Sequence, residues 1–329
     1  MMTAMRPITY LVLALMLAVG RSSLHAQEAE HGEAVEVVGQ DAHAEEAAHG
    51  PSDQIDITHH IGNSNEIETP FGVIHLPQWE PIPIGGILLD LSPTKHTVFM
   101  AFAALVVALT FLLSARAVRK AERSGKPAKG FAGAMEAMAL WIRQEVVLPN
   151  VGHHGAGYAP YLLTLFFFIL VMNLLGLMPW GATATGNISV TAALALIAFL
   201  VIEISGMKAL GFKGYMNTIF FVPAGLPGGV GGAILKPLLL VIMTPIEIIG
   251  KLAKPFALAV RLFANMTAGH VLVLALIGLT FIFKSYSVGI ASSALATGIM
   301  LLELFVAFLQ AYVFTLLTAV FIGLMRESH

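Results

Sequence analysis

The chain has 329 residues, of which 57% are hydrophobic and only 12% are charged, and its mean hydropathy is +0.81. Soluble domains contain about 25% charged residues, so this composition excludes an ordinary soluble protein and predicts a polytopic membrane protein. The sequence contains no cysteine, which excludes a disulfide framework and a thiolate metal site. The net charge of −2 is small, but the charged residues are distributed unevenly along the chain.

Residues 1–26 are predicted to form a secretory signal peptide. Arg6 supplies a positive start, the apolar stretch from Ile8 to Val19 is too short to span a membrane, and Ala26 fits the cleavage position. Leu24 is larger than the small residue usual near such a site, so an uncleaved anchor is the alternative.

Residues 27–95 are predicted to be an acidic, histidine-rich extension outside the membrane, because no Lys or Arg occurs between Gln27 and Thr94. Residues 28–50 have the low complexity of a disordered segment, and short Ile and Val runs in 51–91 predict one or two strands. The histidines indicate either a metal site or a solvated tail. Since only His59 and His60 are adjacent, we favour the solvated tail and expect no metal or cofactor.

Residues 96–329 are predicted to form an all-α membrane domain with five transmembrane helices. The expected spans are 96–115, 161–180, 188–207, a long segment over 236–283, and 290–324, with an amphipathic surface helix over 131–149. The first span is followed at once by Arg116, Arg119, Lys120, Arg123, Lys126 and Lys129. Because cytoplasmic loops are rich in Lys and Arg, this pattern predicts an outside N-terminus and an inside C-terminus.

The last two apolar segments are much longer than the roughly 20 residues that a perpendicular span needs. We expect both helices to be strongly tilted and packed together as a hairpin. For the first of them, the alternatives are a course lying partly flat or a break at Pro237, Pro245 or Pro255.

Arg261 is the most informative residue of the chain, because it lies in the middle of the long apolar segment. An arginine at the centre of a membrane helix costs about 2.5–3.5 kcal/mol on insertion scales and marks a functional site by default. Small residues recur at helical spacing on the same face, namely Gly250, Ala253, Ala257, Ala264 and Ala268. This face therefore predicts close approach of another helix to a permanent cation.

Other polar residues of the last two segments are expected to line up with Arg261. Asn265 is one turn further on, His270 lies beyond it, and Glu247 precedes Arg261 by almost four turns. Glu303 and Gln310 share a face of the final segment. A hairpin would bring these residues into one buried line between two helices. Histidine and glutamate exchange protons, whereas arginine keeps its proton and acts as an electrostatic gate, so the pattern indicates a proton path.

Three stretches resemble subunit a of the membrane sector of the F-type ATP synthase. The most specific is the run from Lys254 to Gly269, which contains Ala259-Val260-Arg261-Leu262-Phe263-Ala264-Asn265-Met266. The runs from Leu309 to Thr318 and from Tyr161 to Leu177 are also similar to that family. The resemblance covers the chain from about Lys95 to its end.

The resemblance implies a role for individual residues. Arg261 matches the family's essential stator arginine, Asn265 and Gln310 match polar residues near it, and Glu247 matches an acidic residue on the cytoplasmic access side. Many bacterial members carry an acidic residue where this chain has His270 and a histidine where it has Glu303. Because either order leaves one acid and one imidazole, we expect these two residues to form a pair in the outer half-channel.

The function that the resemblance implies is that of the stationary, non-catalytic proton-translocating subunit of a rotary ATP synthase in a bacterial inner membrane. Its implied partners are the ring of c subunits, the b-type peripheral stalk and, through these, the catalytic head. Nucleic acid is not an expected partner.

Simpler interpretations exist for the same residues. Arg261 is alternatively part of a structural salt bridge, His270 and Glu303 a static buried pair, and Asn265 and Gln310 ordinary interhelical hydrogen-bonding residues. Glu247 is alternatively a solvated residue at a helix end. Glu203 lies near the inner end of its span and is expected to be interfacial rather than functional. The rival functions are a secondary ion or metal transporter with an outer histidine-rich tail, which should show inverted repeats, and a membrane scaffold, which needs no central arginine.

Overall fold

The structure is a computed structural model that describes residues 66–69, 72–79, 82–84, 87–89, 92–152, 155–178, 183–220 and 230–327. The predicted signal peptide and most of the predicted extension lie outside these residues. The chain divides into two compact units. Of the described residues, the first unit contains those within 1–107, 168–193 and 262–310, and the second contains those within 108–167, 194–261 and 311–329.

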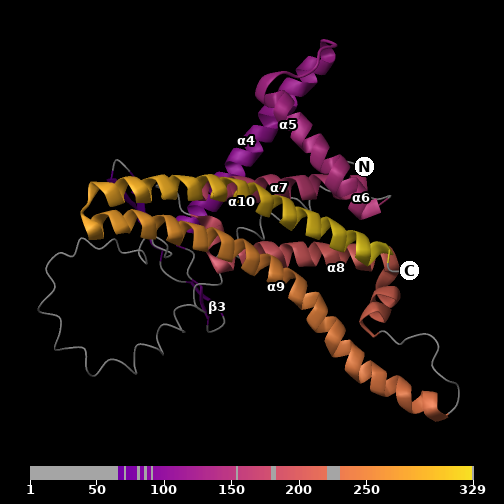
Figure 1. The fold of residues 1–329 in the computed structure, drawn as a ribbon. Helices are drawn as coiled ribbons and strands as arrows, with labels where there is room; N and C mark the ends of the chain where they lie inside the picture. The colour runs from indigo at the N-terminus through magenta and orange to yellow at the C-terminus, as the bar shows by residue number, and fades with distance from the viewer. Residues whose placement is uncertain are drawn as a thin grey trace, which may run out of the picture. The chain divides into compact units, whose positions relative to one another are not determined.

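Five long helices dominate the described part of the chain (Figure 1). They are α4 (Lys95–Arg123), α7 (Gly155–Gly176), α8 (Ile188–Ile219), α9 (Val230–Phe283) and α10 (Tyr286–Glu327). Each is long and apolar enough to cross a membrane. The predicted all-α polytopic membrane fold with five spans is confirmed, and the protein is a multi-pass membrane protein.

The helices differ from the predicted spans mainly in length. Pro160 lies inside α7 rather than at its start, and α9 continues through Pro237, Pro245 and Pro255 without a break. Membrane helices tolerate proline because neighbouring groups satisfy the freed backbone carbonyls. The alternative of a break in this segment is therefore wrong. α8 extends to Ile219 and bends at Gly211, whose φ of 71° and ψ of 166° are not helical.

Shorter elements occupy the remaining described segments. The predicted surface helix consists of α5 (Gly130–Trp141), a π-helical turn (Ile142–Val147) and α6 (Leu148–Val151). Two antiparallel hairpins pair β1 (Glu66–Thr69) with β2 (Gly72–His75) and β3 (Ile82–Ile84) with β4 (Ile87–Leu89). These hairpins lie within the segment in which one or two strands were expected.

The first unit contains the hairpin of the last two helices. Lys284 and Ser285 alone separate α9 from α10, and Lys284 has the positive φ of 46° that reverses the chain there. Figure 1 shows the two helices running antiparallel from this turn. Near the turn, the hydroxyl groups of Thr280 and Ser292 are hydrogen-bonded at 2.7 Å, so the expected hairpin is present.

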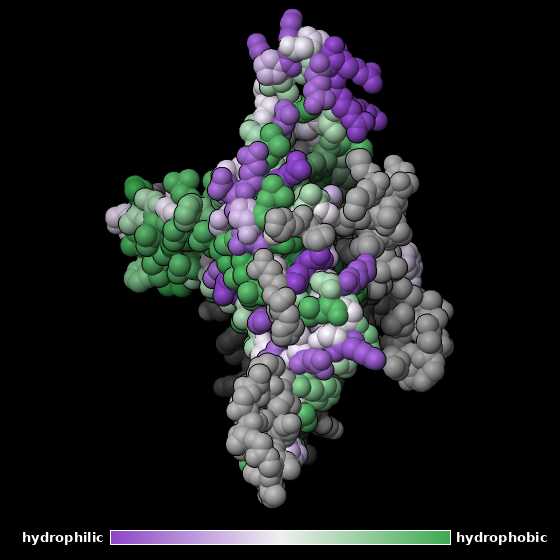
Figure 2. Space-filling view, turned by 90° about the vertical axis from the view of Figure 1, so that its right-hand side faces the viewer, coloured by the Kyte–Doolittle hydropathy of each residue, from purple (hydrophilic) through white to green (hydrophobic). Residues whose placement is uncertain are grey.

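The second unit has an apolar core of fully buried side chains, among them Ile142, Leu162, Phe166, Phe314 and Ile322. Gly323 of α10 packs against the backbone carbonyl of Asn150, where a side chain would collide. The six cations that follow the first span are exposed. Figure 2 shows hydrophilic residues gathered at this end of the unit, over the end of α4 and the start of α5.

Candidate functional site

Arg261 lies on a face of α9 that no described residue of the chain covers. The small residues predicted to share this face, Gly250, Ala253, Ala257, Ala264 and Ala268, are each at least partly open to the outside, and Arg261 itself is exposed. The neighbouring face of α9 is buried through Leu258 and Ala259. Among the residues that the structure describes, Arg261 forms no ion pair, so the alternative of a structural salt bridge finds no partner there.

Asn265 and Gln310 form a hydrogen bond within the first unit. The Asn265 side-chain amide donates to Gln310 Oε1 at 3.1 Å. Gln310 is buried, whereas Asn265 is exposed. Arg261, which precedes Asn265 by one helical turn, is exposed as well. The expectation of a single buried line of polar residues is therefore wrong for Arg261 and Asn265, whose side chains remain accessible.

Glu303 of α10 packs against Gly269 of α9. A Cβ atom built on Gly269 would collide with the Glu303 carboxyl group, so the carboxyl occupies the space that the glycine leaves. Within the described residues, Glu303 Oε1 is buried and has no hydrogen-bond partner. His270, which is half-buried, follows Gly269 directly. The structure thus brings Glu303 to the turn of α9 that contains His270.

Asn173 is a buried polar residue that the sequence analysis missed. Its side-chain amide donates to the backbone carbonyl of Ala307 at 3.2 Å, and its Oδ1 accepts a hydrogen bond from the Thr185 hydroxyl at 2.8 Å. Ala307 lies between Glu303 and Gln310 on α10. Asn173 therefore holds α10 at a point between these two predicted proton-path residues. An asparagine inside an apolar span was itself a signal of such a role.

The two remaining acids lie in the second unit. Glu247 is exposed on α9, in the same unit as Arg261 but without a described contact to the other predicted residues. Glu203 is buried, with Lys251 Nζ at 3.8 Å from its Oε2. Lys251 of α9 thus covers the Glu203 side chain, and the expected interfacial position of Glu203 in the membrane stays a prediction.

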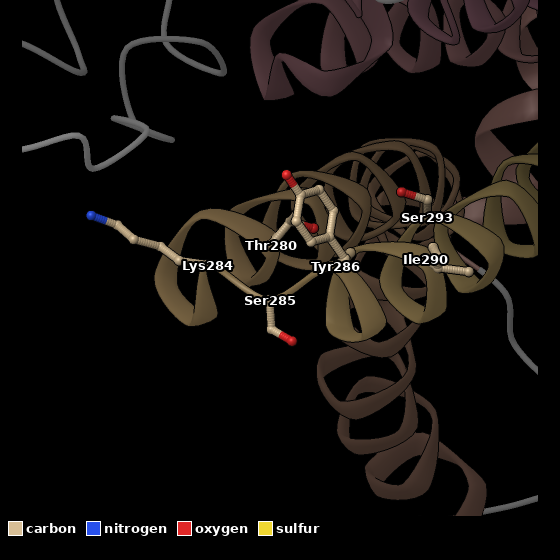
Figure 3. A pocket seen from close by; sticks show the side chains of 7 residues that line it. Thr280, Lys284, Ser285, Tyr286, Ile290 and Ser293 are labelled. Carbon is tan, nitrogen blue, oxygen red and sulfur yellow. The ribbon is translucent and has the colours of Figure 1, made fainter.

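A cavity of about 580 Å³ lies at the turn between α9 and α10 (Figure 3). Its lining includes Thr280, Tyr286 and Ser293, and the Lys284 side chain points away from them. None of the predicted site residues lines this cavity. In the described part of the chain, no group of three or more His, Asp or Glu side chains could hold a metal ion.

Comparison with known proteins decides the family. The family model described as ATP synthase A chain matches residues 97–323, which is more than half of the chain. The chain belongs to this family. The matched range includes Arg261 and all the other predicted proton-path residues.

Named relatives of the ATP synthase A chain family cover most of the sequence. The "ATP synthase subunit a" of Chloroherpeton thalassium is 46% identical over 280 residues, which are 84% of this chain and 79% of the relative. The "ATP synthase subunit a 2" of Chlorobaculum tepidum is 47% identical over 94% of this chain and 82% of its own length. The "ATP synthase subunit a" of Myxococcus xanthus is 42% identical over 78% of this chain and 86% of its own length.

Proposed function

We propose that this protein is the stator subunit of the membrane sector of a rotary ATP synthase, where it provides two proton half-channels that Arg261 separates. One observation carries the proposal: Arg261 is an exposed cation that has no ion-pair partner among the described residues. It lies on an apolar helix, on the strip of small residues formed by Gly250, Ala253, Ala257, Ala264 and Ala268. A cation without a partner is costly at the depth of the hydrocarbon core. The strip therefore suits a moving helix that carries a carboxylate, which is what the rotor ring of c subunits supplies.

In this proposal, protons enter through an outer half-channel that Glu303 and His270 line, and they protonate the rotor carboxylate. Asn265 and Gln310, hydrogen-bonded to each other, lie next to the point of transfer. After nearly a full rotation the protons leave through an inner half-channel near Glu247. Arg261 attracts the returning carboxylate and prevents protons from passing directly between the half-channels. Each charge that crosses 100 mV releases about 2.3 kcal/mol, which drives rotation.

The subunit itself performs no covalent chemistry in this proposal. Its partners are the c-subunit ring, the b-type peripheral stalk and, through them, the catalytic head that makes ATP. The uneven distribution of Lys and Arg supports an orientation with the N-terminus in the periplasm and the C-terminus in the cytoplasm of a bacterial inner membrane. The predicted signal peptide, which precedes the acidic extension, supports the same orientation.

The test is ATP-driven proton pumping by inverted vesicles that carry the complete complex. We expect Arg261→Ala to abolish pumping while the complex still assembles, and to increase passive proton leak, because no fixed cation then separates the half-channels. Arg119→Ala, which removes an exposed arginine from the end of α4, is the matched control and should pump normally. Normal pumping by Arg261→Ala would contradict the proposed gate and favour a transporter or scaffold.

A further inference from the structure

A buried polar cluster within the second unit joins α8 to α9. Lys251 Nζ lies 3.8 Å from Glu203 Oε2, and the hydroxyl group of Tyr215 donates a hydrogen bond to the same carboxylate oxygen. Lys251 Nζ also donates to Thr218 Oγ1 at 3.4 Å and lies 4.5 Å from the centre of the Tyr215 ring. The exposed fractions of Glu203, Lys251 and Tyr215 are only 8%, 7% and 9%.

The bend of α8 at Gly211 makes this cluster possible. Glu203 and Tyr215 are 12 residues apart, a distance of about 18 Å along a straight helix, which is beyond the reach of a hydrogen bond between their side chains. Gly211 adopts φ 71° and ψ 166°, a conformation that is essentially restricted to glycine. The chain therefore turns back after Gly211 and brings Tyr215 to the carboxylate.

The cluster has the properties of a static connection rather than of a proton relay. Among the described residues, none of its four side chains has a buried polar atom without a hydrogen-bond partner. Because Glu203, Lys251 and Tyr215 are buried, they also lack the contact with water through which a relay exchanges protons. An ion pair of this kind is costly to desolvate, and removal of one partner leaves an uncompensated buried charge. In some proteins such pairs specify one arrangement of the elements that they join.

Lys251 lies on the same helix as Arg261, so a contact that holds Lys251 also restrains the helix that carries Arg261. Lys251 precedes Arg261 by about 15 Å of helix, and Pro255 lies between them. Because proline has no backbone N–H, Pro255 leaves the carbonyl of Lys251 without its usual helical donor. Pro255 therefore weakens α9 between Lys251 and Arg261. The buried face that begins with Lys251 continues through Leu258 and Ala259, so the rotation of α9 about its axis decides whether Arg261 is exposed.

We propose that Glu203 and Lys251 are positioning residues whose buried ion pair, closed by Tyr215 and Thr218, fixes the rotation of α9 and so keeps Arg261 on the uncovered face. This inference rests on the proposed function of Arg261 as the gate. Without the ion pair, α9 turns about its axis at Pro255, and Arg261 no longer meets the rotor carboxylate on every step.

The experiment compares variants in inverted vesicles that carry the complete complex, with proton pumping measured per ATP hydrolysed. Lys251→Met and Glu203→Gln should each lower this ratio several-fold, because protons slip past a misplaced Arg261. Lys251→Arg keeps a cation opposite Glu203 and should restore most of the ratio. Lys208→Met, which removes an exposed lysine of α8, is the matched control and should leave it unchanged. A merely structural role would lower the amount of complex but not the ratio, so an unchanged ratio overturns the proposal.

A second measurement covers variants that fail to assemble. A spin label on Ile249→Cys, an exposed position of α9 in a chain without other cysteines, reports helix motion in the full-length chain in lipid vesicles. Lys251→Met should increase its mobility and Lys251→Arg should not; equal mobility in both would overturn the proposal. Arg261→Ala is measured in parallel. Normal pumping by Arg261→Ala contradicts the proposed function alone, and the spin label then still tests the fixation of α9.

Discussion

Gly269 allows the carboxyl group of Glu303 to pack directly against the backbone of α9. Any Cβ atom at this position would overlap that carboxyl group. In a helix, glycine is less favourable than alanine by about 1 kcal/mol, so this glycine costs helix stability. The close approach that it permits places an acid beside the turn that contains His270.

We predict that Gly269→Ala lowers ATP-driven proton pumping several-fold, because the new methyl group displaces the Glu303 carboxyl group. Gly278→Ala is the matched control on the same helix, since a Cβ there meets no atom within 4 Å. The measurement is pumping by inverted vesicles at equal amounts of complex. If both variants pump equally well, the position of the carboxyl group does not matter for proton entry.

The hydrogen bonds of Asn173 lead to a prediction about stability. Asn173→Leu leaves the Thr185 hydroxyl without its acceptor and the Ala307 carbonyl without the amide. We expect a loss of about 1–3 kcal/mol in the free energy of unfolding, the usual cost of buried polar groups left unpaired. Titration with a denaturing detergent measures it. Thr164→Val removes an exposed hydroxyl that bonds only within its own helix and should change this free energy little; an equal loss in both variants would contradict the argument.

At the scale of single residues, the sequence predicts which residues are unusual. It predicts less well where the side chains of these residues lie. The cost of an arginine in an apolar helix identified Arg261, and helical spacing placed it on the strip of small residues. Spacing could not show that the strip is uncovered, because exposure depends on which helices pack against α9. Helical spacing also could not reveal that Lys251 is the partner of Glu203, because the two residues lie on different helices that only the folded structure brings together.

Gly211 controls the course of α8 at the scale of the element. A Cβ atom there would meet nothing within 4 Å, so its φ of 71° and ψ of 166° alone forbid other residues. We predict that Gly211→Ala lowers the free energy of unfolding by about 1–3 kcal/mol through backbone strain. The same detergent titration measures this change. Gly278→Ala, at a position without positive φ, should instead be neutral or stabilising, and a similar response of both variants would argue against strain.

The number and type of the long helices could be predicted from hydropathy because a membrane span needs a long apolar run. Their ends could not, because an apolar run and the helix that contains it need not end at the same residue. α4, for example, continues through its cluster of cations to Arg123. The prolines of α9 were also ambiguous, since proline breaks helices in water but is often tolerated within membrane helices.

At the scale of the whole molecule, the uncovered strip of α9 predicts contact with another subunit. Ala257→Trp places a large side chain on this strip, one turn before Arg261, and should abolish proton pumping by preventing close approach of the rotor. Leu252→Trp is the control, because Leu252 is also exposed but precedes Arg261 by about two and a half turns and so lies on the opposite side of the helix. Pumping by both variants at the level of the unchanged protein would show that the strip is not the rotor contact.

The two-residue turn between α9 and α10 has a consequence for biogenesis. Residues on either side of it, such as Thr280 and Ser292, are close in the chain as well as in space, so little entropy is lost when the helices meet. Contacts of such short sequence separation form early. The last two helices are therefore able to enter the bilayer as one preassembled pair, in which Gln310 already satisfies Asn265 before any other subunit arrives.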